Sequence, residues 1–145
     1  MSTTLPDTRT PVLQGWTLSQ NEPDVISIDG TAYRPHPYGW GLVALTAFVS
    51  ADVHVGPNAI VRDRAVVVGG VRLFDEAIVE QNAVVAGMCT LRDRARVGGD
   101  AVLRDNVTMH DAAHADGLVR ISGSVKLRYF AHVSIGNITG GITIS

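Results

Sequence analysis

The sequence is poor in the features that mark several common classes of protein. It has one cysteine, Cys89, so a disulfide within the chain is excluded and nothing indicates an oxidising compartment. Charged residues make up 18%, and the formal net charge is only −2, which disfavours nucleic acid and anionic membranes as partners. No apolar run is long enough to span a bilayer, and the first residues lack the apolar stretch of a secretion signal. We therefore expect one soluble domain that folds in a cytoplasm.

What the sequence has in abundance is a repeat of six residues. From Ala47 to Gly136 the chain divides without a gap into fifteen hexads. Their first position is Ala nine times, Val five times and Cys once, and their third is Val, Leu, Ile or Met in all but the hexad with Ala115. Because residues two apart lie on the same side of an extended strand, each hexad predicts a short strand with one buried face.

The last two positions of the hexads predict corners between these strands. They collect Gly, Asp and Asn, as at Asp63, Gly69 and Asp105, and these residues tolerate tight or left-handed backbone conformations. A period of six does not match the 3.6-residue turn of an α-helix. Three hexads close a triangular coil of 18 residues, so fifteen hexads predict an all-β, parallel β-helix of about five coils.

The hexads resemble those of the hexapeptide-repeat, left-handed parallel β-helix family. The resemblance covers residues 41–136 and rests on the small first residue, the aliphatic third residue and the Gly or Asp corners. It implies a left-handed winding, which general rules of chain crossover would not predict. Family members include acyltransferases and γ-class carbonic anhydrases, and they are typically trimers. This chain lacks extruded loops, and in that respect it resembles loopless members from phages and bacteria.

The flanking sequence predicts caps for the β-helix. We expect an extended N-terminal arm at residues 1–22, a β-hairpin cap with an entry strand at 23–46, the β-helix at 47–136, and a C-terminal strand or tail at 137–145. The hairpin is indicated by Asp29-Gly30, which joins two alternating strands. Since a β-helix exposes strand edges at its ends, we expect the arm or the C-terminal end to contact a larger protein assembly.

Residues 18 apart should stack, which sorts the outward side chains onto three faces. The first face is mostly apolar over four coils, and such a surface usually marks an interface. An alternative is that β-branched residues merely suit strands. We predict a homotrimer whose interface contains Phe48, Val66, Val68, Val84, Ala86 and Val102.

The second face is basic, and the third brings two histidines together. On the second face, an anion or an acidic partner could bind Arg72, Arg92, His110, Lys126 and Arg128. The alternative is a solvated face whose charges are neutralised by Asp75, Asp93 and Asp111 at the next corner. On the third face His114 and His132 are one coil apart and should be stacked neighbours.

Two enzymatic functions follow from the resemblance. An acyl-coenzyme A-dependent acyltransferase would use a histidine as general base, for which His110 or His54 is the candidate. A γ-carbonic anhydrase would bind zinc through three histidines. The segment Arg104 to His110 is similar to the one that supplies the first ligand, but the spacing of the next two histidines is not met. His114 and His132 are candidate metal ligands, with no third ligand evident.

The sequence favours a non-catalytic function over these alternatives. Cys89 holds a first position inside a coil, which predicts a buried apolar role and not a nucleophile. No catalytic residues beyond the candidate base and no cofactor are indicated. We therefore expect a trimeric structural or assembly protein, with an accessory virion component, such as a capsid decoration or tail protein, as one specific expectation.

Overall fold

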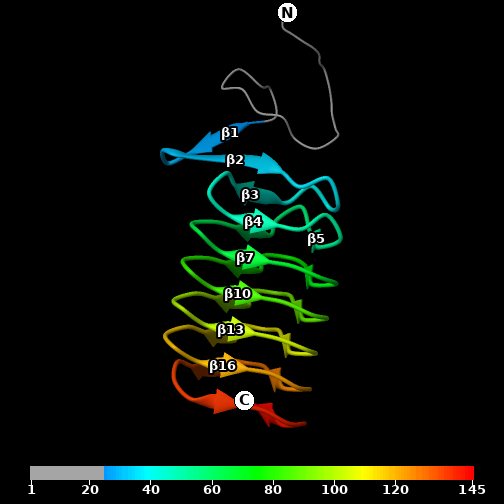
Figure 1. Ribbon diagram of the computed structural model, residues 1–145, viewed down its shortest axis with the longest axis vertical. Helices are drawn as coiled ribbons and strands as arrows, with labels where there is room; N and C mark the ends of the chain where they lie inside the picture. Colours follow the sequence, from blue (N-terminus) through cyan, green and yellow to red (C-terminus); the bar gives the residue numbers. More distant parts are fainter. Residues whose placement is uncertain (1–24) are drawn as a thin grey trace, which may run out of the picture.

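A computed structural model describes residues 25–145 of the chain. This part is all β, and it winds into three sheets that form the sides of a prism (Figure 1). The parallel β-helix predicted from the hexads is confirmed. In the described residues there is no helix that could cross a membrane. The predicted N-terminal arm, residues 1–22, lies outside the described residues.

Sheet A is the longest side of the prism and has eight strands. The first two strands are antiparallel to their neighbours, and the others are parallel. In spatial order the strands are β1 (Ile26–Ile28), β2 (Thr31–Pro35), β3 (Leu42–Ala44), β6 (Ile60–Val61), β9 (Ile78–Val79), β12 (Arg96–Val97), β15 (His114–Ala115) and β18 (His132–Val133).

Sheets B and C have six parallel strands each. Sheet B contains β4 (Phe48–Val49), β7 (Val66–Val67), β10 (Val84–Val85), β13 (Val102–Leu103), β16 (Arg120–Ile121) and β19 (Asn137–Ile138). Sheet C contains β5 (His54–Val55), β8 (Arg72–Leu73), β11 (Thr90–Leu91), β14 (Thr108–Met109), β17 (Lys126–Leu127) and β20 (Thr143–Ile144).

The register between coils places residues 18 apart side by side. Val84 pairs with Val66 on one neighbouring strand and with Val102 on the other, so the predicted stacking is confirmed. The first and third residues of the hexads point inward and form one continuous core. Cys89 belongs to this core, and burial raises the pKa of its thiol to about 11, which keeps it protonated and unreactive at neutral pH.

The winding extends beyond the hexads at both ends, which makes about six coils where the repeat predicted five. At the start, β3 pairs in parallel with β6. At the end, β19 and β20 pair with β16 and β17, so residues after Gly136 continue the coil. Asn137 lies opposite Arg120, 17 residues before it, because the last corner is one residue shorter than the others. This shortening breaks the six-residue pattern without ending the winding.

A hairpin covers the first edge of sheet A. Strands β1 and β2 pair across Asp29 and Gly30, which both have positive φ angles, as a tight hairpin turn requires. Strand β2 then pairs with β3, where Tyr33 lies opposite Ala44 and is buried. The parallel sheet is therefore closed on this side by an antiparallel pair.

Carboxylates at the corners brace each coil against the next. Asp75, Asp93 and Asp111 all adopt positive φ angles between 55° and 60°. Asp111 N donates to Asp93 Oδ2 at 2.9 Å, and Asp93 N donates to Asp75 Oδ2 at 3.1 Å. These side chains satisfy amide groups that the turn leaves outside the sheets. We call this stack the Asp ladder.

Removal of one rung of the Asp ladder should destabilise the fold. Asp93→Ala deletes the acceptor for the Asp111 amide and places a Cβ-bearing residue without local hydrogen bonding at φ 59°. We expect the free energy of unfolding, measured by urea denaturation, to fall by about 1–2 kcal/mol. Asp93→Asn keeps an acceptor oxygen and tolerates this conformation, so it should lose much less. Equal losses in the two variants would contradict the role given to the side-chain oxygen.

Candidate functional site

The residues predicted to form the trimer interface lie together on the outside of sheet B. They come from four neighbouring strands, β4, β7, β10 and β13, and from the residue that follows β7 and β10. Phe48 is 58% exposed, and the valines that follow it along the sheet are partly exposed. We call this surface the apolar face: Phe48, Val66, Val68, Val84, Ala86 and Val102.

Two corner residues next to sheet B add apolar surface that the sequence prediction did not include. Met88 follows β10 at one corner and is 59% exposed, and Leu118 precedes β16 at the other corner and is 66% exposed. The face ends toward the C-terminus at Arg104 and Arg120, which are exposed and charged. The apolar surface therefore has a polar boundary at its C-terminal end, and a polar margin is typical of protein interfaces.

The predicted basic residues lie along sheet C, and the acidic residues beside them form hydrogen bonds with the backbone. Arg72 and Lys126 are exposed on β8 and β17, and the others follow the strands of the same sheet. The carboxylates of Asp75 and Asp93 accept hydrogen bonds from backbone amides of the next coil. These hydrogen bonds leave the carboxylates charged, so the basic residues of the sheet have negative charge beside them at the corners. The basic residues are Arg72, Arg92, His110, Lys126 and Arg128.

His110, a candidate general base on sheet C, has a carboxylate partner that the sequence analysis did not assign. Its Nδ1 lies 3.0 Å from Oδ2 of Asp111, the next residue. A hydrogen bond from the Tyr129 amide, with a smaller contribution from His110, lowers the pKa of Asp111. The carboxylate is thus held in its charged form and can orient the imidazole.

The other candidate base, His54, is packed between two aromatic rings. Its ring centroid lies 4.9 Å from that of Tyr38 and 5.1 Å from that of Phe74. Its Nδ1 is buried and has no hydrogen-bond partner among the described residues. Within the described residues, His54 therefore has ring contacts but no carboxylate partner of the kind that His110 has.

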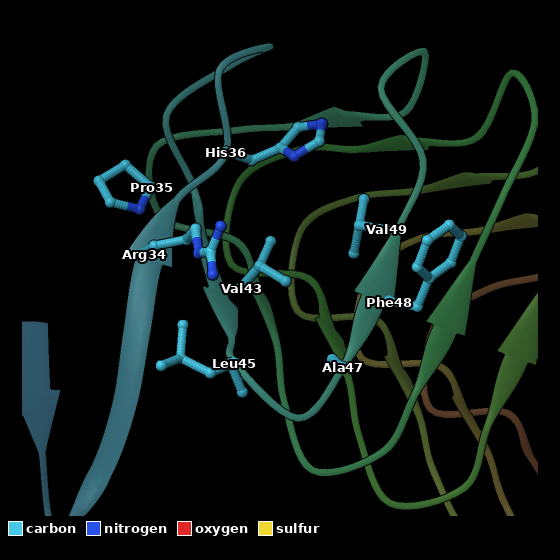
Figure 2. Close-up of a pocket in the computed structure, with 9 residues that line it drawn as sticks. Arg34, Pro35, His36, Val43, Leu45, Ala47, Phe48 and Val49 are labelled. Carbon is cyan, nitrogen blue, oxygen red and sulfur yellow. The ribbon is translucent and has the colours of Figure 1, made fainter. Parts of the chain in front are cut away.

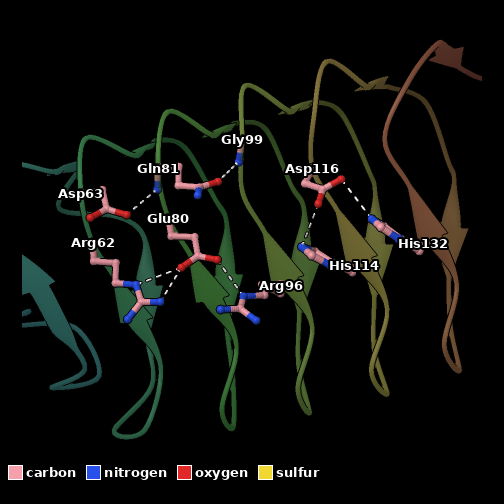
Figure 3. A network of polar contacts seen from close by, with 9 residues as sticks. All are labelled: Arg62, Asp63, Glu80, Gln81, Arg96, Gly99, His114, Asp116 and His132. Atoms are coloured by element: carbon pink, nitrogen blue, oxygen red, sulfur yellow. Dashed lines mark hydrogen bonds and ion pairs between the residues drawn. The ribbon is translucent and has the colours of Figure 1, made fainter.

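The two histidines on sheet A stack as predicted, and the structure adds an acidic residue to them (Figure 3). The rings of His114 and His132 are 4.8 Å apart between centroids, with 7° between their planes. Asp116 lies beside both, with Oδ2 at 3.5 Å from Nε2 of His114 and Oδ1 at 3.0 Å from Nε2 of His132. Burial, with a smaller contribution from the nearby His132, lowers the pKa of His114. His110 follows a strand of sheet C, so His110, His114 and His132 do not form one site within a chain.

Farther along sheet A, Glu80 forms an ion-pair network between two arginines (Figure 3). Its Oε1 accepts from Nε of Arg62 at 3.0 Å, and its Oε2 accepts from Nε of Arg96 at 2.7 Å. Its side chain is only 10% exposed. Burial would raise the pKa of Glu80, but the hydrogen bonds and charges of Arg62 and Arg96 outweigh burial and lower it.

Neutralising Glu80 should destabilise the fold in a pH-dependent way. We expect Glu80→Gln to lower the free energy of unfolding by about 1–2 kcal/mol at pH 7, since two partly exposed arginines lose a charged partner. Because the folded-state pKa is lowered, the contribution is present above the ordinary value of 4.5 and disappears as the pH falls through the folded-state pKa. Urea denaturation at pH 7 and at lower pH measures both effects.

Glu76→Gln serves as the matched control for this prediction, because Glu76 is an exposed glutamate at a corner. It should change stability little at either pH. A Glu80→Gln deficit that persists unchanged in acid would contradict an electrostatic origin.

A shallow pocket lies at the N-terminal end of the prism (Figure 2). Phe48 and Val49 form one side of it, and Val43 and Leu45 lie on the other. His36 also lines the pocket, but its Nε2 is engaged with the carbonyl oxygen of Val53 at 2.9 Å. Arg34 lines the pocket as well, so its wall combines apolar side chains with polar groups.

Comparisons with known proteins do not assign a function to these sites. No family model, no curated protein and no solved structure matches this chain.

Proposed function

We propose that the protein is a non-catalytic, homotrimeric structural or assembly module, in which the apolar face packs against two further copies of the chain. The observation that carries this proposal is the continuity of the face. Apolar side chains follow one another across four hydrogen-bonded strands, from Phe48 to Val102. Burial of such a surface in an interface would gain about 25 cal/mol for each Å² of apolar area removed from water.

The number of copies is supported by the resemblance of the hexads to the hexapeptide-repeat, left-handed β-helix family. We propose that the chain is a loopless member of that family. Members typically pack side by side around an axis parallel to the β-helix, and a flat sheet with small outward residues such as Ala86 allows close approach of a neighbouring prism. The polar margin at Arg104 and Arg120 would then lie at the edge of the contact.

The fold supports an assembly role because the coils are rigidly linked to one another. Each central strand is hydrogen-bonded to the coil before it and the coil after it, and the Asp ladder joins the corners. Contact with a larger assembly through the arm or the C-terminal end, and the accessory virion role, stay predictions.

The mass of the protein in solution tests this proposal. Sedimentation equilibrium at micromolar concentration should give a species of three times 15.4 kDa, the mass of one chain. A single species of 15.4 kDa at all concentrations would contradict the proposed trimer.

An acyl-coenzyme A-dependent acyltransferase is the second candidate, and the contact between His110 and Asp111 favours it. If Nδ1 of His110 carries the proton and donates it to the carboxylate, Nε2 is left to accept a proton from a hydroxyl or amine substrate. Turnover of acetyl-coenzyme A with a panel of amines and sugars tests this function. Activity that is abolished by His110→Ala would establish the enzyme and displace the non-catalytic proposal.

A further inference from the structure

The backbone register fixes two imidazole rings on neighbouring strands of sheet A. His114 on β15 pairs directly with His132 on β18, and both side chains point out of the prism. The distance of 4.8 Å between the ring centroids matches the spacing of adjacent strands, so the stacking follows from the fold. The fold therefore holds the two imidazole rings side by side.

Asp116 completes a cluster of three potential ligands. It is two residues after His114, which places its side chain on the same outer side of the sheet. Each carboxylate oxygen is directed at Nε2 of a different histidine (Figure 3). One ligand atom from each residue lies within 4.8 Å of the other two.

We propose that His114, Asp116 and His132 bind a divalent transition metal ion such as Zn²⁺ on the outside of sheet A. Two imidazole nitrogens and a carboxylate oxygen form a donor set that suits zinc and its neighbours, whereas Mg²⁺ and Ca²⁺ prefer oxygen ligands alone. Three protein ligands leave a fourth position of a tetrahedral ion open to water or to another ligand. This inference does not depend on the trimer or on the apolar face.

Small side-chain movements would suffice to close the site. A zinc–nitrogen distance of about 2.1 Å in a tetrahedral site requires the two Nε2 atoms to approach to about 3.4 Å. The His132 side chain is 56% exposed, so its ring can tilt toward His114 without disturbing the core. The nearest cation along the sheet, Arg96, is paired with Glu80, which reduces its repulsion of a metal ion.

A second cluster of similar composition, Asp93, His110 and Asp111, is less suited to a metal. Both of its carboxylates already accept backbone hydrogen bonds in the Asp ladder, from Asp111 N at 2.9 Å and from Tyr129 N at 3.0 Å. Binding an ion there would compete with bonds that hold the coils together. This comparison makes His110 a matched control for the proposed site.

Titration calorimetry with ZnCl₂ on the full chain, prepared without a polyhistidine tag, tests the proposal. We expect one Zn²⁺ per chain for the wild type. Removing a ligand in His132→Asn should weaken binding by at least about tenfold, and Asp116→Asn should act in the same direction. His110→Asn should bind zinc as the wild type does. Because the His132 side chain is exposed, its variant should fold as the wild type does, and circular dichroism checks this.

The ring signals of the histidines in NMR spectra give a second readout. Zinc should shift the signals of His114 and His132 and leave those of His110 unchanged. The proposal is overturned if the wild type does not bind zinc at one equivalent, if His132→Asn binds it equally well, or if zinc shifts the signals of His110 alone.

Discussion

Val84→Glu should convert the protein from trimers into folded monomers. Val84 lies at the centre of the apolar face, paired with Val66 and Val102. A glutamate there would point outward, so the core would be unaffected, but trimer formation would bury its carboxylate against apolar side chains. An unpaired buried charge costs about 3 kcal/mol or more, and a trimer would contain three of them. Sedimentation equilibrium should therefore show one chain of 15.4 kDa.

A charge of the same sign on another side of the prism provides the control for Val84→Glu. Arg72→Glu changes an exposed residue on sheet C, outside the apolar face, and should leave the trimer intact. Circular dichroism should show the same strand signal for both variants. If Val84→Glu sediments as the wild type does, the apolar face is not the contact surface.

Leu91→Ala should lower the free energy of unfolding more than Asp93→Ala or Glu80→Gln does. Leu91 is fully buried on β11, between Leu73 and Met109 of the neighbouring coils. The backbone of each coil is hydrogen-bonded to the next, which restricts how far the walls can collapse into the space left behind. We expect the free energy of unfolding, from urea denaturation, to fall by about 2–5 kcal/mol.

The residue before Leu91 separates the loss of core packing from a general effect on the strand. Thr90 lies on the same strand but points outward, so Thr90→Ala should cost less than about 1 kcal/mol. A loss for Leu91→Ala no larger than that of Thr90→Ala would mean that this position does not lie in a packed core.

The sequence predicts the β-helix well because its signal is local and repeated. Small residues at the first position and aliphatic residues at the third determine which side of each strand is buried, and this pattern recurs in every hexad. The pairing of Val66 with Val84 follows directly from a coil of 18 residues. The last coil was missed because its corner is one residue short, which breaks the period although Ile138 and Ile144 still pack against the core.

The sites could be predicted only in part, because they depend on side chains from different coils. The stacking of His114 on His132 follows from the repeat. The position of Asp116 beside them could have been predicted from the sequence, because the motif His-x-Asp puts both side chains on one side of a strand. The burial of Glu80 could not be predicted from the sequence. It depends on two arginines that fold over the carboxylate and on Gly98, whose missing side chain leaves room for it.

Photo-crosslinking from Phe48 tests the central claim, that copies of this chain meet through the apolar face, most directly. Replacing Phe48 with p-benzoylphenylalanine keeps an aromatic ring at the most exposed position of that face, and the same replacement at Arg72 places the probe on sheet C. Irradiation should give covalent dimers and trimers from position 48 and mainly monomers from position 72. Monomers alone from position 48, or equal yields from the two positions, would contradict the claim.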